Sequence, residues 1–356
     1  MRKSIRKPRP VYLGCDNVLH VYNHAAGVRG ELIFDAEDKE MFYQNLKHWT
    51  KLHYVVVLGY CVMDNHFHLI VLLPKKVPSL RNVAKRYNRF YKGKKMPLNV
   101  KHHKHLLIKE RARLCSLGDF MKMVQEHFTK KYNKEYPKKL IRQAERAGRE
   151  LPQNPKRRKG GFWDERYGAV ALQGSYAVWK CLCYVELNMV RVQPEVYQSP
   201  LDYPFCSLGR YHLMGEHLNE EGFLYYMNKF PINNKPDFKT IHELKDGILS
   251  FILTNIMQFK SQKYQSVDFR ESVKSLLDEG LPLEAFWERM GGTDIFRKGH
   301  VVCDLSQIDK NDLAQVEILS LFPTSKSEEA TPGFSYGEKG ICRGLSCSQR
   351  PYLSSA

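Results

Sequence analysis

The sequence predicts an α/β (α+β) fold: a central, mainly antiparallel sheet flanked by helices, followed by a helical appendage. The first half of the chain contains apolar runs typical of strands. Two of these runs are followed by segments whose apolar residues recur at the spacing of a helix. Further helical patterns occupy the second half of the chain. With 356 residues, 43% of them hydrophobic, the chain is long enough for one substantial core and a second, smaller unit.

The first predicted unit is a strand followed by a helix. Residues 18–23 have the composition of a strand, and they enter a glycine-containing loop at 25–30. Asp35 can then cap a helix, because apolar residues recur after it at helical spacing, at Phe42, Leu46 and Trp49.

A strand hairpin is the best-defined element of the sequence. Residues 54–74 are almost continuously apolar and are interrupted at 63–65, which favours two buried strands joined by a tight connection. Strand alternation places His66 and His68 on one face of the second strand and the apolar residues between and after them on the other. One rigid strand therefore presents two neighbouring imidazoles.

The second strand-and-helix unit begins at residue 161. Residues 161–172 resemble a strand, and Ser175 can cap a helix that runs to about Arg191. Tyr184 and Asn188 lie about 40° apart on the flank of its buried face. The apolar stripe of this helix consists of Val178, Leu182, Val185 and Met189.

The C-terminal half carries weaker signals. A proline-rich junction at 194–204 precedes helical patterns at 241–259 and 269–290, and Gly291-Gly292 marks a break. From residue 323 the serine, glycine and lysine content predicts a disordered tail.

The charge of the chain favours a polyanionic partner. Lys and Arg number 56 against 38 Asp and Glu, which gives a formal net charge of +18 and favours nucleic acid over a membrane. No apolar run is long enough to span a bilayer, and no signal-like core follows the basic start, so we expect a soluble, cytoplasmic protein. The nine scattered cysteines lack a CxxC pair and are expected to be reduced thiols.

Two basic stretches are candidate DNA-contacting segments. Residues 81–114 carry twelve Lys or Arg and one acid, Glu110, interleaved with aromatic residues, and 138–160 carries nine Lys or Arg and two Glu, with a flexible loop expected at 152–161. Cations suit the backbone of a single strand, and aromatic rings can stack on its bases. The alternative is a solvated basic helix and loop. The residues selected as nucleic-acid contacts are Arg81, Lys85, Arg86, Tyr87, Arg89, Arg166 and Arg191.

The strand that carries His66 and His68 is a candidate metal site, because imidazole is a good ligand for a divalent cation. The alternative is a pair of core histidines satisfied by hydrogen bonds, since burying imidazoles without partners costs roughly 1–3 kcal/mol each. An HxH triplet alone is weak evidence, and the chain contains a second one, His103-Lys104-His105, in a basic context where a phosphate contact or solvation is the better interpretation.

The order of these segments resembles that of the REP-associated tyrosine transposases, the single-tyrosine branch of the HUH transposases. The resemblance spans residues 12–214. The matching segments are Val21-Tyr22-Asn23, the helix from Asp35, Tyr60 to His68, Phe162 to Tyr167, Cys183 to Arg191 and Asp202 to Ser207. Asp64 and Met189 stand where such proteins usually have proline.

The resemblance implies a ferredoxin-like HUH domain with Tyr184 as nucleophile, His66 and His68 as metal ligands and Asn188 as a further ligand. The implied reaction cleaves and rejoins single-stranded, hairpin-associated DNA through a 5′-phosphotyrosine link, with Mg²⁺ or Mn²⁺ as cofactor. The resemblance also implies a bacterial protein that is associated with the nucleoid when it is bound to DNA.

The same reasoning divides the chain into four parts. These are a basic tail at 1–11, the HUH domain at 12–214 with basic insertions at about 90–117 and 138–160, a mainly helical region at 215–322 and the tail at 323–356.

Two other functions fit parts of the sequence. A non-catalytic DNA- or RNA-binding protein on the same scaffold accounts for the charge and the aromatic residues equally well. A metal-dependent phosphodiesterase that uses water is the third reading, and Tyr132 and Tyr136 are the fallback nucleophiles if Tyr184 lies far from the histidines. The sequence leaves a monomer and a homodimer equally open.

Overall fold

The structure, a computed structural model, describes residues 15–27, 33–231 and 237–257, together with three short strands at 300–303, 334–336 and 342–346. Four antiparallel strands form its centre, in the order β2-β3-β1-β4. Their bounds are β1 Asn17–His24, β2 Val56–Val62, β3 His66–Leu73 and β4 Gly168–Gln173. The predicted fold class, an antiparallel sheet flanked by helices, is confirmed.

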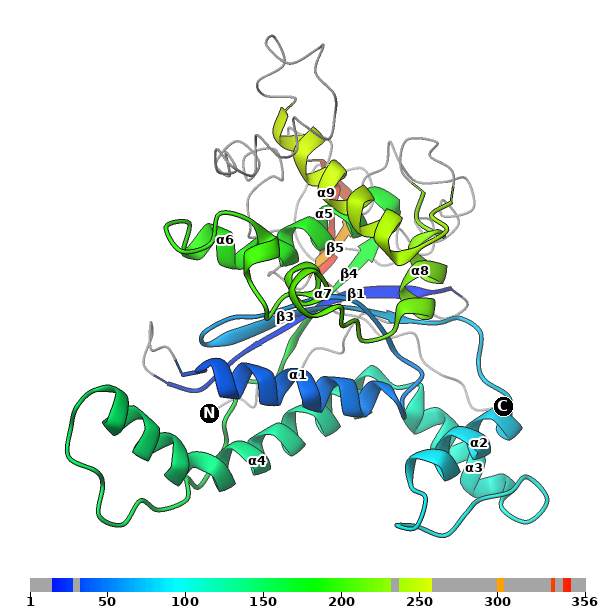
Figure 1. Ribbon diagram of the computed structural model, residues 1–356. Coiled ribbons are helices and arrows are strands. Elements are labelled where there is room, and N and C mark those ends of the chain that lie inside the picture. The colour runs from blue at the N-terminus through cyan, green and yellow to red at the C-terminus, as the bar shows by residue number, and fades with distance from the viewer. Residues whose placement is uncertain are drawn as a thin grey trace, which may run out of the picture.

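One face of the sheet is covered by α1 (Ala36–Thr50) and α4 (Leu117–Arg146) (Figure 1). The predicted cap is confirmed, since Asp35 accepts from the Asp38 amide and Asp38 accepts from the Asp35 amide, a capping box. The long helix packs through a stripe repeated every four residues, namely Phe120, Val124, Phe128 and Tyr132. These side chains meet the apolar residues of β1 and β3.

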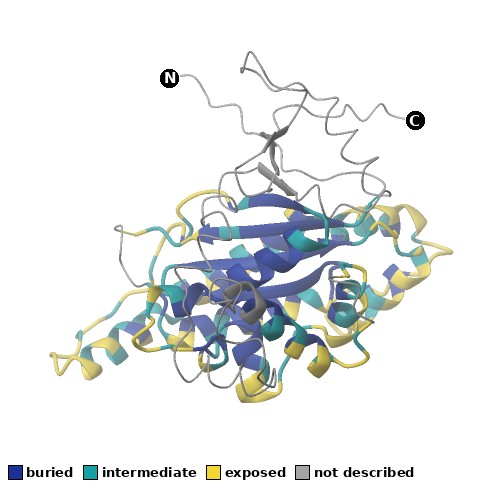
Figure 2. Cartoon of the chain, turned by 90° about the horizontal axis from the view of Figure 1, so that it is seen from above, coloured by how far each residue is buried: buried dark blue, intermediate teal, exposed yellow. Residues whose placement is uncertain are grey.

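The other face is covered by α5 (Ser175–Glu186), whose neighbours are α7 (Ser207–Met214), α8 (Glu220–Met227) and α9 (Ile241–Met257). Both sheet faces are therefore buried, as the dark strands in Figure 2 show. Because β1 and β3 alternate, Leu19 and Phe67 face α1 and α4, whereas Val18 and Ile70 face α5.

The predicted helix from Ser175 to Arg191 differs in two details. Its cap is Gly174, which has no side chain to bond the first amides, so Ser175 is the first helical residue. The helix is assigned in two pieces, because Leu187 separates α5 from α6 (Asn188–Val192). Hydrogen bonds from Leu187 to Cys183 and from Arg191 to Leu187 nevertheless continue the helical path.

The basic segments contain more helix than the sequence indicated. They form α2 (Leu80–Phe90), α3 (Lys104–Leu114) and much of α4, which accepts Pro137 within it. Buried Lys139 binds the Asp38 carboxylate and the Ile33 carbonyl, which anchors this part of α4 to α1. Residues 152–161 form the predicted loop, and β4 begins only at Gly168 rather than at 161.

The C-terminal strands are a further difference. β5 (His300–Cys303) pairs in parallel with β4, and β7 (Cys342–Ser346) joins β5 to β6 (Phe334–Tyr336). Strand therefore occurs in both the region expected to be helical and the tail expected to be disordered. Of the predicted helices, α9 is present, and 269–290 lies outside the described residues. Among the helices that the structure describes, none is both long and apolar enough to cross a membrane.

Burial of His53 makes the stability of the fold depend on pH. The ring contacts Trp49 and Phe120, its Nδ1 donates to the Trp49 carbonyl at 3.1 Å, and burial lowers its pKa to about 4. Because the unfolded chain takes up this proton near pH 6.5, the unfolded state binds more protons between pH 6.5 and 4. We expect this residue to remove about 3 kcal/mol of stability as the pH falls through that window.

The variant His53→Asn keeps a donor for Trp49 but cannot titrate. The loss in the free energy of unfolding between pH 7 and pH 4.5, measured by urea denaturation, should be smaller in this variant by about 2–3 kcal/mol. An unchanged pH dependence would show that His53 takes up its proton as readily in the folded chain as in the unfolded one.

Candidate active site

The two histidines of the HxH triplet lie at the start of β3, on the face that carries α5. His68 is fully buried and His66 is 9% exposed, while Phe67 between them packs on the opposite face. The β2–β3 connection is short, and the Met63 amide bonds the His66 carbonyl at 2.8 Å to close it. The predicted placement of both imidazoles on one face is confirmed.

Strand β1 contributes a second pair of imidazoles that sequence reasoning missed. Its register sets His24 opposite His66 and Tyr22 opposite His68, so His20, Tyr22 and His24 lie on the same face. The ring centroids of His24 and His66 are 4.6 Å apart, those of His66 and His68 4.9 Å, and those of His68 and His20 5.0 Å. The spacing of two residues between His20, Tyr22 and His24 was the signal that could have found them.

This row of four imidazoles runs from the interior to the surface. His20 and His68 are fully buried, whereas His24 is exposed at the other end. The His24 end is therefore the end of the row that faces solvent, and His66 is the neighbouring ring there.

Hydrogen bonds engage one ring nitrogen of each predicted histidine ligand. The Nδ1 of His66 lies 2.6 Å from the Asn65 side-chain oxygen, which only accepts, so Nδ1 carries the proton. The Nδ1 of His68 lies 2.9 Å from the Nε2 of His20. For His66 this leaves the Nε2 lone pair as the one suited to a cation. For His68 the same holds when its Nδ1 is the donor to His20, and the tautomer of the pair decides this.

Helix α5 places Tyr184 against this row. The Tyr184 ring meets His68 edge-on at a centroid distance of 5.5 Å and His20 at 5.7 Å. Tyr184 is fully buried rather than at the edge of the buried face as predicted, because α5 is enclosed on all sides from Ala177 to Glu186. The structure brings together Tyr184, His68 and His66, three of the four residues predicted as nucleophile and metal ligands.

Asn188 follows Tyr184 by one helical turn and is fully buried. Its amide donates to the Tyr184 carbonyl at 2.9 Å, and its oxygen accepts from Arg191 at 3.4 Å. Beyond it, Gln193 donates to Asp64 at 3.0 Å. The segment that holds Asn188 is thus fixed at one end over His68 and at the other over the turn that precedes His66.

Asp64 is the centre of that turn. Its carboxylate binds the Lys39 ammonium at 2.5 Å and Gln193 on its other oxygen. The Tyr203 hydroxyl donates to the Val62 carbonyl at 2.5 Å, so the segment from Asp202 to Ser207 supports the same turn. Asp64 therefore joins α1, the β2–β3 turn and the end of α6, which accounts for an acid at this position.

The segment from Phe162 to Tyr167 lies beside the end of β1. Asn23 donates to the Glu165 carbonyl at 3.0 Å, and the Asp164 amide donates to the His24 carbonyl at 3.0 Å. Arg166, the next residue, is exposed. It follows a residue anchored next to His24, at the surface end of the imidazole row.

No protein-family model and no curated protein matches the chain. A solved structure described as "Structure of the REP associates tyrosine transposase bound to a REP hairpin" is similar over 66% of this chain and 96% of its own length, with 11% sequence identity and a TM-score of 0.34. A likeness this distant carries no information about a reaction.

His66, His68 and Asn188 supply some of the donor atoms that a divalent cation needs. Within the described residues, no three His, Cys, Asp or Glu side chains form a group that could hold a metal ion. The implied set is two imidazole nitrogens and the Asn188 amide oxygen, which has a second lone pair beside its bond from Arg191. Such a set leaves positions for phosphate oxygens or water, as phosphate chemistry with Mg²⁺ or Mn²⁺ requires.

The predicted nucleic-acid contacts fall into two groups. Arg81, Lys85 and Arg89 are exposed and share one side of α2, because they are four residues apart. Arg86 instead donates to the His53 carbonyl at 2.7 Å and stacks on a tyrosine ring, and Tyr87 is buried in the core. These two residues therefore stabilise the packing of α2.

The remaining candidates are also placed by the structure. Arg191 is partly buried on Asn188, and His103 precedes α3 and accepts from the Asn99 amide at 3.2 Å. Tyr132 and Tyr136, the fallback nucleophiles, pack on the face of the sheet opposite the histidines. Tyr184 is thus the tyrosine of the three that lies with them.

The buried Lys39–Asp64 pair gives a stability prediction for the site. In Asp64→Ala the Lys39 ammonium, whose side chain is 8% exposed, loses its carboxylate, and we expect the free energy of unfolding to fall by about 3 kcal/mol in urea denaturation. The exposed pair Glu135–Lys138 is the control, and Glu135→Ala should cost less than about 1 kcal/mol. The double variant Lys39→Met, Asp64→Leu should recover most of the loss. Equal costs for Asp64→Ala and Glu135→Ala would contradict this role.

Proposed function

We propose that this chain is a metal-dependent DNA strand transferase that cleaves and rejoins single-stranded, hairpin-associated DNA with Tyr184 as its nucleophile. The observation that carries the proposal is the position of the Tyr184 ring, which lies against His68 and His20 on a strand face with four imidazoles. Binding of nucleic acid alone does not require a phenol and an HxH strand to meet. The net charge of +18 supports DNA as the substrate.

His66, His68 and Asn188 would hold a divalent cation, Mg²⁺ or Mn²⁺. When bound, such a cation polarises the scissile phosphate and stabilises the charge that develops on it. The protein prepares the two imidazoles by engaging Nδ1 of each, through Asn65 and His20. His20 is therefore a positioning residue for His68.

The chemical step is a transesterification. The Tyr184 oxygen attacks phosphorus and gives up its proton, the bond to the 3′-oxygen breaks, and the 3′-hydroxyl leaves with a proton. The 5′-phosphate is then esterified to Tyr184. A second 3′-hydroxyl can attack this ester and release the tyrosine, which rejoins DNA without another energy source.

Cationic side chains around the site would hold the phosphate backbone. Arg191 lies on Asn188 next to the nucleophile, and Arg166 follows the segment anchored at the exposed end of the imidazole row. Further away, Arg81, Lys85 and Arg89 give α2 a basic stripe that suits non-specific backbone contact.

A non-catalytic DNA- or RNA-binding protein is the second candidate, and one observation favours it. Tyr184, Asn188 and His68 have no exposed surface, so a phosphate reaches them only after the residues that cover them move. A protein that has lost strand transfer can keep such a site closed and still bind through its exposed cations.

Covalent adduct formation distinguishes the two candidates. The full chain is incubated with end-labelled, hairpin-flanked single-stranded DNA and Mn²⁺, and the products are separated on a denaturing gel. We expect a labelled protein band that is lost in Tyr184→Phe, in His66→Ala and after chelation with EDTA. The control Tyr132→Phe removes a hydroxyl on the other face of the sheet and should keep the band. Tight binding without an adduct across a panel of hairpins would favour the binding protein.

The role of His20 gives a second prediction. In His20→Asn the Nδ1 of His68 loses its imidazole partner, and we expect the affinity for Mn²⁺, measured by titration without DNA, to fall about 10–100-fold. The ¹⁵N shifts of the His68 ring should change as its tautomer becomes mixed. His127→Asn is the matched control, since His127 bonds Asn45 outside this site. Unchanged Mn²⁺ affinity in His20→Asn would remove His20 from the site.

A further inference from the structure

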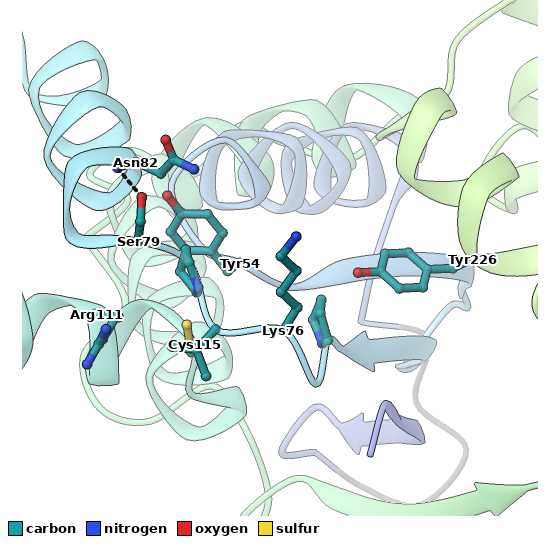
Figure 3. A pocket seen from close by; sticks show the side chains of 10 residues that line it. Tyr54, Lys76, Ser79, Asn82, Arg111, Cys115 and Tyr226 are labelled. Atoms are coloured by element: carbon teal, nitrogen blue, oxygen red, sulfur yellow. Dashed lines mark hydrogen bonds between the residues drawn. The ribbon is translucent and has the colours of Figure 1, made fainter. Parts of the chain in front are cut away.

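A pocket of about 450 Å³ lies at the end of the sheet away from the histidines. Figure 3 shows the side chains that line it. It is bounded by the loop between β3 and α2, by α3, and by α8 from the other face of the sheet. Pro74, which lines it, follows His68 by six residues along β3, so the two sites are about 20 Å apart. That length corresponds to about six steps of one strand in B-form DNA.

Two tyrosine rings lie in the walls of the pocket, Tyr54 from the segment before β2 and Tyr226 from α8. The Arg86 guanidinium lies 4.0 Å from the centroid of the Tyr54 ring and donates to the His53 carbonyl. The Tyr54 ring is therefore held in place by its neighbours. Fixed aromatic surfaces of this kind bind the flat faces of nucleobases.

The charged residues of the pocket are both cations, Lys76 and Arg111. Among the residues that the structure describes, no Asp or Glu lines the pocket, and neither cation has a carboxylate within 4.0 Å. Asn82 adds an amide that can both donate and accept, and the exposed stripe of α2 continues from it through Lys85 and Arg89. Rings, cations and an amide are the groups that bind a nucleotide.

We propose that this pocket holds one nucleotide of the bound DNA, its base against Tyr54 or Tyr226 and its phosphate at Lys76 and Arg111. The inference rests on the proposed function only in taking DNA as the ligand. A nucleotide held about 20 Å from His68 sets how far along the strand the cleaved bond lies. The pocket is thus a ruler that positions the substrate, in addition to the backbone contacts around the histidines.

Binding to a labelled hairpin with a single-stranded flank is measured by fluorescence anisotropy in EDTA, so that no cleavage occurs. Arg111→Ala should weaken binding about fivefold to tenfold and lower the salt slope by about one. Its control is Lys109→Ala, an exposed cation on the same helix that does not line the pocket, which should change binding less than about twofold. Equal effects of the two variants would overturn the proposal.

The contribution of the tyrosine rings is tested with a second pair of variants. Tyr226→Leu should weaken binding about 10-fold with an unchanged salt slope, whereas Tyr225→Leu, on the exposed neighbour outside the pocket, should leave it unchanged. Photocrosslinking with 5-iodouracil at successive positions should label Tyr54 or Tyr226 from one position of the strand. Crosslinks that avoid both tyrosines at every position would overturn the proposal.

Two further outcomes separate the possible ligands and the two proposals. If deoxynucleoside monophosphates bind with the same dependence on Arg111 and Tyr226 while DNA binding does not depend on them, the pocket takes a free nucleotide and the DNA ruler is wrong. If Arg111→Ala binds normally and still forms the Tyr184 adduct, the pocket proposal fails while the proposed function stands.

Discussion

The antiparallel pairing of β1 with β3 is the constraint on which the rest of the structure depends. Its register sets His24 opposite His66 and Tyr22 opposite His68, and strand alternation then sends Val21 and Phe67 to the other face. A slip of one residue in either strand would turn its imidazoles toward α1 and α4 and its apolar side chains toward α5. The same register thus creates the core under α1 and the polar row under α5. Site and fold are specified by one hydrogen-bonded ladder.

Close packing of α5 on β2 gives that row its tyrosine. A Cβ built on Gly59 would lie 2.4 Å from Leu182, so a larger residue there would push the helix off the strand. Behind the helix, the buried Glu186 carboxylate accepts from the Ser207 hydroxyl and from the Leu208 amide at 2.9 Å, which ties α5 to the start of α7. Burial raises the pKa of Glu186, and its bonds face α7 rather than the histidines. Glu186 therefore holds the helix and takes no part in the chemistry proposed for Tyr184.

The sequence predicted what depends on local pattern. The β2–β3 hairpin and the Asp35 cap follow from spacing within one or two elements. The meeting of His68 with Tyr184 was implied only by the family resemblance, because no spacing brings α5 to β3. The spacing of His20 and His24 puts them on one face of β1, but it does not say that β3 is the neighbouring strand, so their place beside His66 and His68 was missed. The β4–β5 pair was missed for the same reason, since it joins residues more than a hundred positions apart. Arg86 shows a second limit of local pattern, because its charge gave no sign that its guanidinium lies against the Tyr54 ring and donates to the His53 carbonyl.

The exposed basic residues of α2 and the candidate active site occupy separate parts of the molecule. The exposed cations Arg81, Lys85 and Arg89 lie on α2, beyond the end of β3, while Tyr184 and Asn188 are enclosed at the start of that strand. Contacts made equally before and during a reaction increase affinity and leave the rate of the chemical step unchanged. In the proposed function, the exposed stripe and the pocket beside it would select and position DNA, whereas the chemical step would depend on uncovering Tyr184 and on the His20–His68 pair. A variant that no longer forms the Tyr184 adduct can therefore still bind DNA at the pocket, and the reverse also holds, because no residue of the imidazole row lines the pocket.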